Sequence, residues 1–150
     1  MMERSFRPPD PEQKDSMLLE TVSLGWIRER QFVMRDRNGF PILMDQPNGV
    51  NAADLLPLSL AGCTSYDVIA ILEKQRQEVA DLSVTAESTR DPDPPWAFRK
   101  IHIHYRLCGH ELSAEKISRA IELAEKKYCG IYATLKDVVE ITSDFEIVDP

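Results

Sequence analysis

One segment in the middle of the chain constrains the fold more than any other. From Ala52 to about Val79 the sequence favours a helix, and as far as Leu72 its residues are apolar on nearly every side. A helix that is apolar all round has to be buried among other elements, which places it at the centre of a fold. Pro57 and Gly62 lie near its beginning, and we expect a kink or break between them. The sequence therefore predicts a kinked central helix with other elements packed around it.

Three strand-like runs precede this helix, at residues 21–27, 30–35 and 40–45. Each is rich in β-branched, aromatic or long apolar side chains, which is typical of strands. Asn38-Gly39 lies between the last two runs and favours a hairpin turn, because both residues tolerate positive φ. We expect the three runs to pair as an antiparallel meander.

The part of the chain after the central helix predicts two long strands, a second helix and a final strand. Residues 82–89 favour a strand, and residues 98–107 alternate strictly between apolar and polar side chains, as in a strand with one buried face. A second helix follows Ser113, and residues 139–148 close the chain as a strand. The apolar face of the alternating strand is Ile101, Ile103, Tyr105 and Leu107, and the apolar stripe of the second helix is Ile117, Ile121, Ala124 and Tyr128. This order predicts an α+β protein with antiparallel sheets around two helices.

The composition limits the class of protein. The chain has 150 residues, of which 43% are hydrophobic, and this suits one domain at residues 19–150 after a flexible tail at residues 1–18. Its net charge of −7 argues against nucleic-acid binding, since phosphates need clusters of Lys and Arg. The charged N-terminus does not resemble a signal peptide, and polar residues interrupt the longest apolar run, so we expect no membrane association. With only three cysteines, we expect a cytoplasmic protein without structural disulfides.

Cys63 lies in the middle of the apolar helix, and two interpretations of it are open. A free cysteine in an apolar helix commonly serves as a small buried hydrophobe. If the helix breaks before Cys63, the free N–H groups of its second segment would instead stabilise a thiolate there. Cys129 is a candidate second thiol, because a cysteine oxidised by peroxide condenses with a neighbouring cysteine to a disulfide. Cys108, at a strand end, fits the role of a bystander.

Two stretches resemble the OsmC/Ohr family of peroxide-stress proteins, namely "NAADLLPLSLAGCTSYDVIAILEKQRQ" and "AEKKYCGIYATLKDVVEIT". The shared pattern is the start of the central helix, a small-small-Cys-[ST] core and a second Cys-[GS] closing the last helix. The resemblance covers about Thr21 to Val148. It implies an OsmC-like fold in an intertwined homodimer, with each active site at the subunit interface.

The same resemblance implies a function. Members of the family reduce hydroperoxides, organic ones above all, in the response to oxidative stress, which is a peroxiredoxin-type oxidoreductase activity. By resemblance Cys63 would be the peroxidatic cysteine and Cys129 the resolving cysteine. A dithiol reductant, small or lipoyl-type, would restore both thiols. No metal or organic cofactor is needed, because sulfur carries the redox chemistry.

The chain departs from the family pattern beside the thiolate. In the best-understood branch an arginine from the N-terminal sheet and a glutamate at the start of the central helix hold it. Here Ala53 stands where the glutamate would fall, and Asp54 is the nearby carboxylate. The candidate arginines are Arg28, Arg30 and Arg35. The absent glutamate favours a second hypothesis, a small-molecule-binding protein of the same fold, with its pocket at the dimer interface and cysteines that turn over little.

Histidines form one more candidate site. His102 and His104 lie on one face of the alternating strand, and Cys108 and His110 follow, so four potential ligands for zinc or copper are close in sequence. A solvent-exposed sheet face explains the same pattern, because alternate residues of a half-buried strand are polar. We therefore expect no metal site, and a metal at the three histidines is a third hypothesis.

Overall fold

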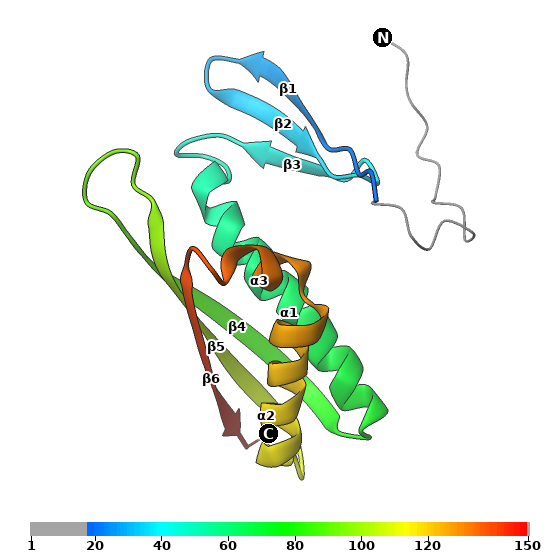
Figure 1. Cartoon of the computed structure of the whole chain (residues 1–150). Coiled ribbons are helices and arrows are strands. Elements are labelled where there is room, and N and C mark those ends of the chain that lie inside the picture. Colours follow the sequence, from blue (N-terminus) through cyan, green and yellow to red (C-terminus); the bar gives the residue numbers. More distant parts are fainter. Residues whose placement is uncertain (1–17, 150) are drawn as a thin grey trace. The chain divides into compact units, whose positions relative to one another are not determined.

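The computed structural model describes residues 18–149 (Figure 1). These residues form two compact units that divide between Asp54 and Leu55. The flexible tail predicted at residues 1–18 lies, apart from Leu18, outside the described residues. The assignment of residues 19–150 to a single domain stays a prediction.

The N-terminal unit contains a three-stranded meander. Its strands are β1 (Ser23–Arg28), β2 (Gln31–Arg35) and β3 (Pro41–Met44), and a single 3-10 turn, η1 (Ala52–Asp54), follows them. β2 pairs antiparallel with both of its neighbours, so the sheet order is β1-β2-β3. The predicted antiparallel meander is confirmed.

The turn between β2 and β3 differs from the predicted one in detail. Only Gly39 has a positive φ, of 87°, whereas Asn38 does not. The Gly39 N–H donates to the Asp36 carbonyl at 3.0 Å, and the Asp36 N–H donates to the Phe40 carbonyl at 3.1 Å. This is a three-residue hairpin loop that closes on a glycine in the left-handed region, and not a two-residue turn.

The central helix α1 (Leu55–Lys74) is continuous, so of the predicted kink or break between Pro57 and Gly62 the break is wrong, and the kink stays a prediction. Pro57 lies in the first turn, where a residue has no intrahelical acceptor for its N–H in any case, so proline does not interrupt the helix. The helix also ends before the predicted limit at Val79. Arg76 takes a positive φ of 56°, which reverses the chain into the next strand.

The C-terminal unit is built on a second three-stranded sheet of order β4-β5-β6. Its strands are β4 (Glu78–Arg90), β5 (Phe98–His110) and β6 (Glu140–Val148). β4 and β5 are antiparallel, but β5 and β6 are parallel, so the expectation of purely antiparallel sheets is wrong for this pair. The chain between β5 and β6 forms helices that cross over the sheet, and such a connection is what parallel neighbours require.

The crossover consists of α2 (Ala114–Leu123), a π-helical turn η2 (Ala124–Tyr128) and α3 (Gly130–Leu135). Ser113 caps α2 as predicted, since its side chain accepts the Lys116 N–H at 3.4 Å. In η2 the hydrogen-bonded turn is widened, and the Cys129 N–H donates to the Ala124 carbonyl at 2.9 Å. The wider turn rotates the residues after Ala124, which leaves Tyr128 53% exposed and outside the predicted apolar stripe.

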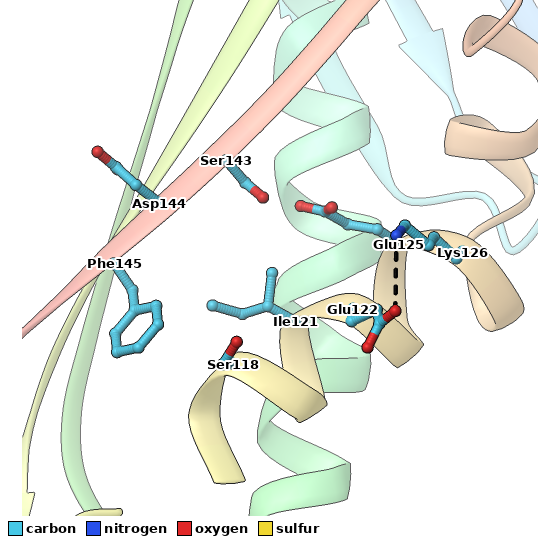
Figure 2. A pocket seen from close by; sticks show the side chains of 8 residues that line it. All are labelled: Ser118, Ile121, Glu122, Glu125, Lys126, Ser143, Asp144 and Phe145. Carbon is cyan, nitrogen blue, oxygen red and sulfur yellow. Dashed lines mark ion pairs between the residues drawn. The ribbon is translucent and has the colours of Figure 1, made fainter. Parts of the chain in front are cut away.

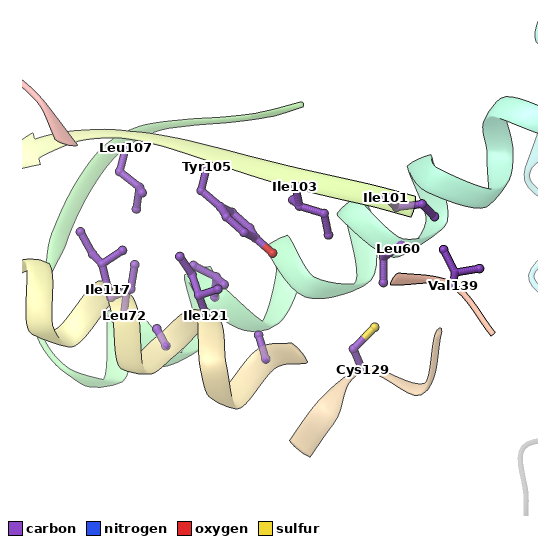
Figure 3. Close-up of a cluster of buried hydrophobic side chains, with 13 residues drawn as sticks. Leu60, Leu72, Ile101, Ile103, Tyr105, Leu107, Ile117, Ile121, Cys129 and Val139 are labelled. Carbon is purple, nitrogen blue, oxygen red and sulfur yellow. The ribbon is translucent and has the colours of Figure 1, made fainter. Parts of the chain in front are cut away.

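The core of the C-terminal unit lies between the sheet and the helices α1 and α2, which cover one face of it (Figures 1 and 3). The predicted apolar face of β5 is fully buried there, together with residues of both helices. Each large apolar side chain removed from water contributes about 1.5–3 kcal/mol to stability. The fully buried members are Leu60, Val68 and Leu72 of α1, Ile101, Ile103, Tyr105 and Leu107 of β5, Ile117 and Ala120 of α2, and Ala124 of η2.

The segment Ala52–Lys74 is long and apolar enough to cross a membrane by length and composition alone. Core helices of soluble proteins pass the same test. Here Leu60, Val68 and Leu72 of this helix have no exposed surface, because they pack in the core of the C-terminal unit. One face of α1 therefore packs in the core, while Leu58 and Tyr66 of the same helix are exposed.

Candidate functional site

Cys63 and Cys129 are neighbours in the C-terminal unit. Cys63 lies in the middle of α1 and is partly buried, and its side chain packs against the core cluster that contains Cys129. Cys129 is only 2% exposed and lies between η2 and α3. Figure 3 shows it at the end of the cluster where Leu60 and Val139 lie. Both thiols are free, so the pair is in the reduced form.

The Cys129 thiol is held in its protonated form. Burial, chiefly, and a hydrogen bond with Cys63 raise the pKa of the Cys129 thiol to about 11. The Tyr132 N–H lies 3.3 Å from the Cys129 sulfur and acts in the opposite direction, because it stabilises negative charge. Burial outweighs this contact, so Cys129 remains a protonated thiol at neutral pH.

The cysteine at a helix N-terminus is Cys129, and not Cys63 as expected. Because α1 does not break, Cys63 lies among hydrogen-bonded helical residues, and the expectation that it begins a second helical segment is wrong. Cys129 is instead the N-cap residue of α3, with its sulfur accepting the Tyr132 N–H. Cys63 is partly exposed and packs against the core cluster that contains Cys129.

A buried polar contact lies beside the cysteine pair. The Tyr105 hydroxyl donates to the Thr64 hydroxyl oxygen at 2.8 Å, and the Thr64 hydroxyl donates to the Leu60 carbonyl at 3.1 Å. Both side chains are fully buried, and burial raises the pKa of the Tyr105 hydroxyl. Thr64 follows Cys63 directly, so this contact ties the cysteine-bearing turn of α1 to the centre of β5.

Glu125 is a buried carboxyl group on the same side of the unit. It belongs to η2, is 8% exposed, and its Oε1 atom has no hydrogen-bond partner among residues 18–149. Burial, the largest influence, raises the pKa of the Glu125 carboxyl, while contacts with Ser143, Lys126 and Tyr105 partly offset the rise.

Sequence reasoning missed Tyr105 and Glu125 as polar groups of this region. The alternation of the strand predicts Tyr105 on its apolar face, and its ring is buried there. The alternation does not predict that the Tyr105 hydroxyl donates to the Thr64 hydroxyl. Glu125 follows Ile121 by one helical turn and adjoins the apolar stripe of the second helix. A carboxylate at the edge of a buried stripe is the signal that could have found it.

The candidate thiolate-stabilising residues all belong to the N-terminal unit, and their role stays a prediction. Arg28 donates to the Gln31 side chain at 3.0 Å, and Arg35 donates to the Gly39 carbonyl at 3.1 Å. Arg30 lies in the turn between β1 and β2, and Asp54 ends η1.

Cys108 and the histidines are distributed along β5. Cys108 is partly buried and pairs in register with Asp81 of β4 and Val148 of β6. The histidine Nδ1 atoms contact β6 side chains: His102 with the Thr142 hydroxyl at 2.7 Å and His104 with an Asp144 carboxyl oxygen at 2.5 Å. Within residues 18–149 no three or more His, Cys, Asp and Glu side chains are grouped as a metal site would require.

Comparison with known proteins finds relatives that cover most of this chain. A family model described as "OsmC-like protein" matches residues 45–144. Protein YhfA of Escherichia coli K12 is 32% identical over 126 residues, which covers 82% of this chain and 94% of that protein.

Solved structures share the fold. A hypothetical protein from Aquifex aeolicus superposes with a TM-score of 0.81 at 28% identity, covering 89% of this chain and 99% of its own. An organic hydroperoxide resistance protein, OsmC, from Legionella pneumophila superposes with a TM-score of 0.64 at 14% identity, covering 87% and 98%. The likeness to the Legionella protein shows the fold alone.

Proposed function

The chain belongs to the OsmC-like protein family, and from this membership we propose that it is a cysteine-based peroxidase that reduces organic hydroperoxides. The family is associated with peroxide stress, and one solved structure of the same fold is named as an organic hydroperoxide resistance protein. The observation that carries the proposal is that the partly exposed Cys63 packs against the core cluster that contains Cys129.

The two thiols divide the reaction between them. The Cys63 thiolate attacks the distal oxygen of the hydroperoxide, an S–O bond forms as the O–O bond breaks, and the alkoxide leaves as an alcohol after taking up a proton. Cys129 then attacks the sulfenic acid at Cys63. An S–S bond forms, the S–O bond breaks, and the departing hydroxide takes the Cys129 proton and leaves as water.

Cys129 suits the resolving role because it stays protonated until it is needed. Its pKa of about 11 keeps it from competing with Cys63 for peroxide, since the thiolate is the reactive form. Cys63 is the more exposed of the two thiols and is therefore the one that a peroxide reaches first.

Further parts of the proposal concern partners. A dithiol, small or lipoyl-type, reduces the Cys63–Cys129 disulfide by thiol–disulfide exchange and is itself oxidised to a disulfide. The protein acts as a homodimer in the cytoplasm, where thiols are kept reduced. An arginine among Arg28, Arg30 and Arg35, or the carboxylate of Asp54, completes the environment of Cys63.

Steady-state hydroperoxide consumption with dithiothreitol as reductant tests this function. We expect the wild-type chain and Cys108→Ser to consume cumene hydroperoxide at equal rates. Cys63→Ser abolishes consumption, and Cys129→Ser leaves a sulfenic acid at Cys63 that the dithiol reduces only slowly. Equal rates in wild type and Cys63→Ser would refute the peroxidase proposal.

A second function is favoured by one observation in the sequence. Ala53 replaces the carboxylate that the best-understood branch places beside the thiolate. A binding protein of the same fold, with a small-molecule pocket at its dimer interface, needs no such group. If hydroperoxide leaves both thiols intact, binding is the function to pursue.

A further inference from the structure

The C-terminal unit carries a hollow that the proposed peroxidase reaction does not use. It lies between the helical crossover and β6 and has a volume of about 460 Å³, a size typical of small-molecule sites. Figure 2 shows Ser143 and Phe145 of β6 directed toward α2 and η2 across this space, with Asp144 pointing away from it. The lining residues are Ser118, Ile121, Glu122, Glu125, Lys126, Ser143, Asp144 and Phe145.

Glu125, which lines the hollow, has a carboxyl oxygen without a hydrogen-bond partner among the described residues. The residue is more than nine-tenths buried, and its carboxyl group extends from η2 toward Ser143 (Figure 2). Its Oε1 atom is buried without a hydrogen-bond partner among the described residues. A buried polar atom without a partner destabilises the fold, and a ligand that donates to it would relieve this cost. An ionised carboxyl group only accepts hydrogen bonds, and the missing partner is therefore a donor.

The surrounding charges indicate that this donor is a cation. Three of the four ionisable lining residues are acidic. The Lys126 ammonium lies 3.5 Å from Glu122 Oε1, and Asp144 bonds His104 on the far face of the sheet at 2.5 Å. Glu125 is thus the lining carboxylate without an ion pair within the described residues. A positive charge brought to it would gain a charge-assisted hydrogen bond.

The rest of the lining indicates the shape of the ligand. Ile121 and Phe145 supply apolar surface next to Glu125, and the hydroxyls of Ser118 and Ser143 can accept further hydrogen bonds. A primary ammonium has three donors, and an apolar substituent on it would contact the isoleucine and phenylalanine side chains. We propose that this hollow is a binding site for a small primary amine with an apolar substituent, whose ammonium group donates to the Glu125 carboxylate.

An NMR titration of the full chain with benzylamine tests the site, with benzyl alcohol and benzoate as matched probes. We expect benzylamine to shift the backbone amide signals of Ser118, Ile121, Ser143 and Phe145, with a dissociation constant on the order of 1 mM. Benzyl alcohol, which lacks the charge, binds at least about tenfold more weakly, and benzoate does not bind.

Two variants locate the interaction. Glu125→Gln weakens benzylamine binding at least about tenfold, whereas Glu122→Gln, at the ion-paired rim, changes it less than about twofold. Ser118→Trp fills the mouth of the hollow from an exposed position of α2 and blocks binding without altering Glu125. The proposal is overturned if benzyl alcohol binds as tightly as benzylamine, if Glu125→Gln binds as the wild type does, or if no amide at the hollow shifts. None of these outcomes depends on whether Cys63 reacts with peroxide.

Discussion

At the scale of single residues, the proposed chemistry depends on Cys63 and on the core cluster with Cys129 against which it packs. The contexts of Cys63 and Cys129 could be matched to a family, and the match named both residues. The Tyr105–Thr64 hydrogen bond and the unpartnered Glu125 oxygen could not be predicted in this way, because they depend on how α1, β5 and η2 meet in space. Local patterns report which face of an element is apolar, and they do not report which polar atoms meet inside a core.

The pKa of Cys129 provides the first prediction. In a Cys108→Ser background, Cys63→Ala removes the hydrogen-bonding thiol and lowers the pKa of Cys129 from about 11, but burial, the larger cause, keeps it above the ordinary cysteine value. Titration of the thiolate ultraviolet absorbance measures the change. An unchanged pKa in the Cys63→Ala background would show that the two sulfurs do not interact.

The pH dependence of the free energy of unfolding tests the raised pKa of the Glu125 carboxyl. Its pKa is raised in the folded state, so the folded protein binds a proton more tightly than the unfolded chain does. The stability linked to this proton is present below the unfolded-state pKa and is lost as the pH rises through the folded-state pKa. We expect Glu125→Gln to remove this loss and to raise the free energy of unfolding by about 1 kcal/mol at neutral or higher pH.

Glu122→Gln is the matched control for this prediction. A hydrogen bond from Arg119, chiefly, and the charge of Lys126 lower the pKa of Glu122, so its carboxylate contributes stability that is lost as the pH falls. Denaturant unfolding across the acidic to neutral range should therefore give opposite signs for the two variants. The same sign for both would contradict the assignment of Glu125 as a buried, weakly satisfied acid.

At the scale of elements, most of the secondary structure could be predicted from side-chain periodicity. The alternation in β5 and the cap at Ser113 are local features, and both are confirmed. The parallel pairing of β5 with β6 is not local, since it depends on the route of the crossover, and the alternation of β6 is the same for either direction. The π-helical turn also escaped prediction, because an extra residue in one turn leaves no mark on composition.

Gly109 tests the packing of β5 against its neighbours. A Cβ atom there would lie 2.2 Å from the Glu78 carbonyl oxygen and 3.1 Å from Leu112. Because backbone must move to admit it, we expect Gly109→Ala to destabilise the fold by about 2 kcal/mol in denaturant unfolding. Gly62→Ala is the control, since nothing lies within 4 Å of a Cβ at that helical position and the change gains up to about 1 kcal/mol. Equal stability of Gly109→Ala and wild type would disprove the close approach.

At the scale of the whole molecule, the account predicts a homodimer. Every residue of β1 is exposed, and apolar side chains are among them and on the neighbouring strands. A three-stranded sheet with exposed apolar side chains gains stability from a covering surface. The exposed apolar residues of this sheet include Leu24, Trp26, Ile27, Ile42 and Leu43.

Sedimentation analysis measures the assembly directly. We expect a species of twice the 17.1 kDa chain mass, and a shift toward the monomer when Leu24→Lys places a charge on β1. Ser88→Lys, at an exposed position of β4, is the control and should leave the mass unchanged. A single species of the chain mass at all concentrations would contradict the dimer.

Peptide mass mapping after about one equivalent of an organic hydroperoxide tests the central claim most directly, because one hydroperoxide accounts for one disulfide. The account predicts rapid loss of two thiols and a peptide that links Cys63 to Cys129, with Cys108 still free. In Cys63→Ser that peptide is absent, and Cys129 survives because its raised pKa protects it. If both thiols of the wild type survive, or if the link joins Cys108 instead, the assignment of Cys63 and Cys129 as a peroxidatic and resolving pair is wrong.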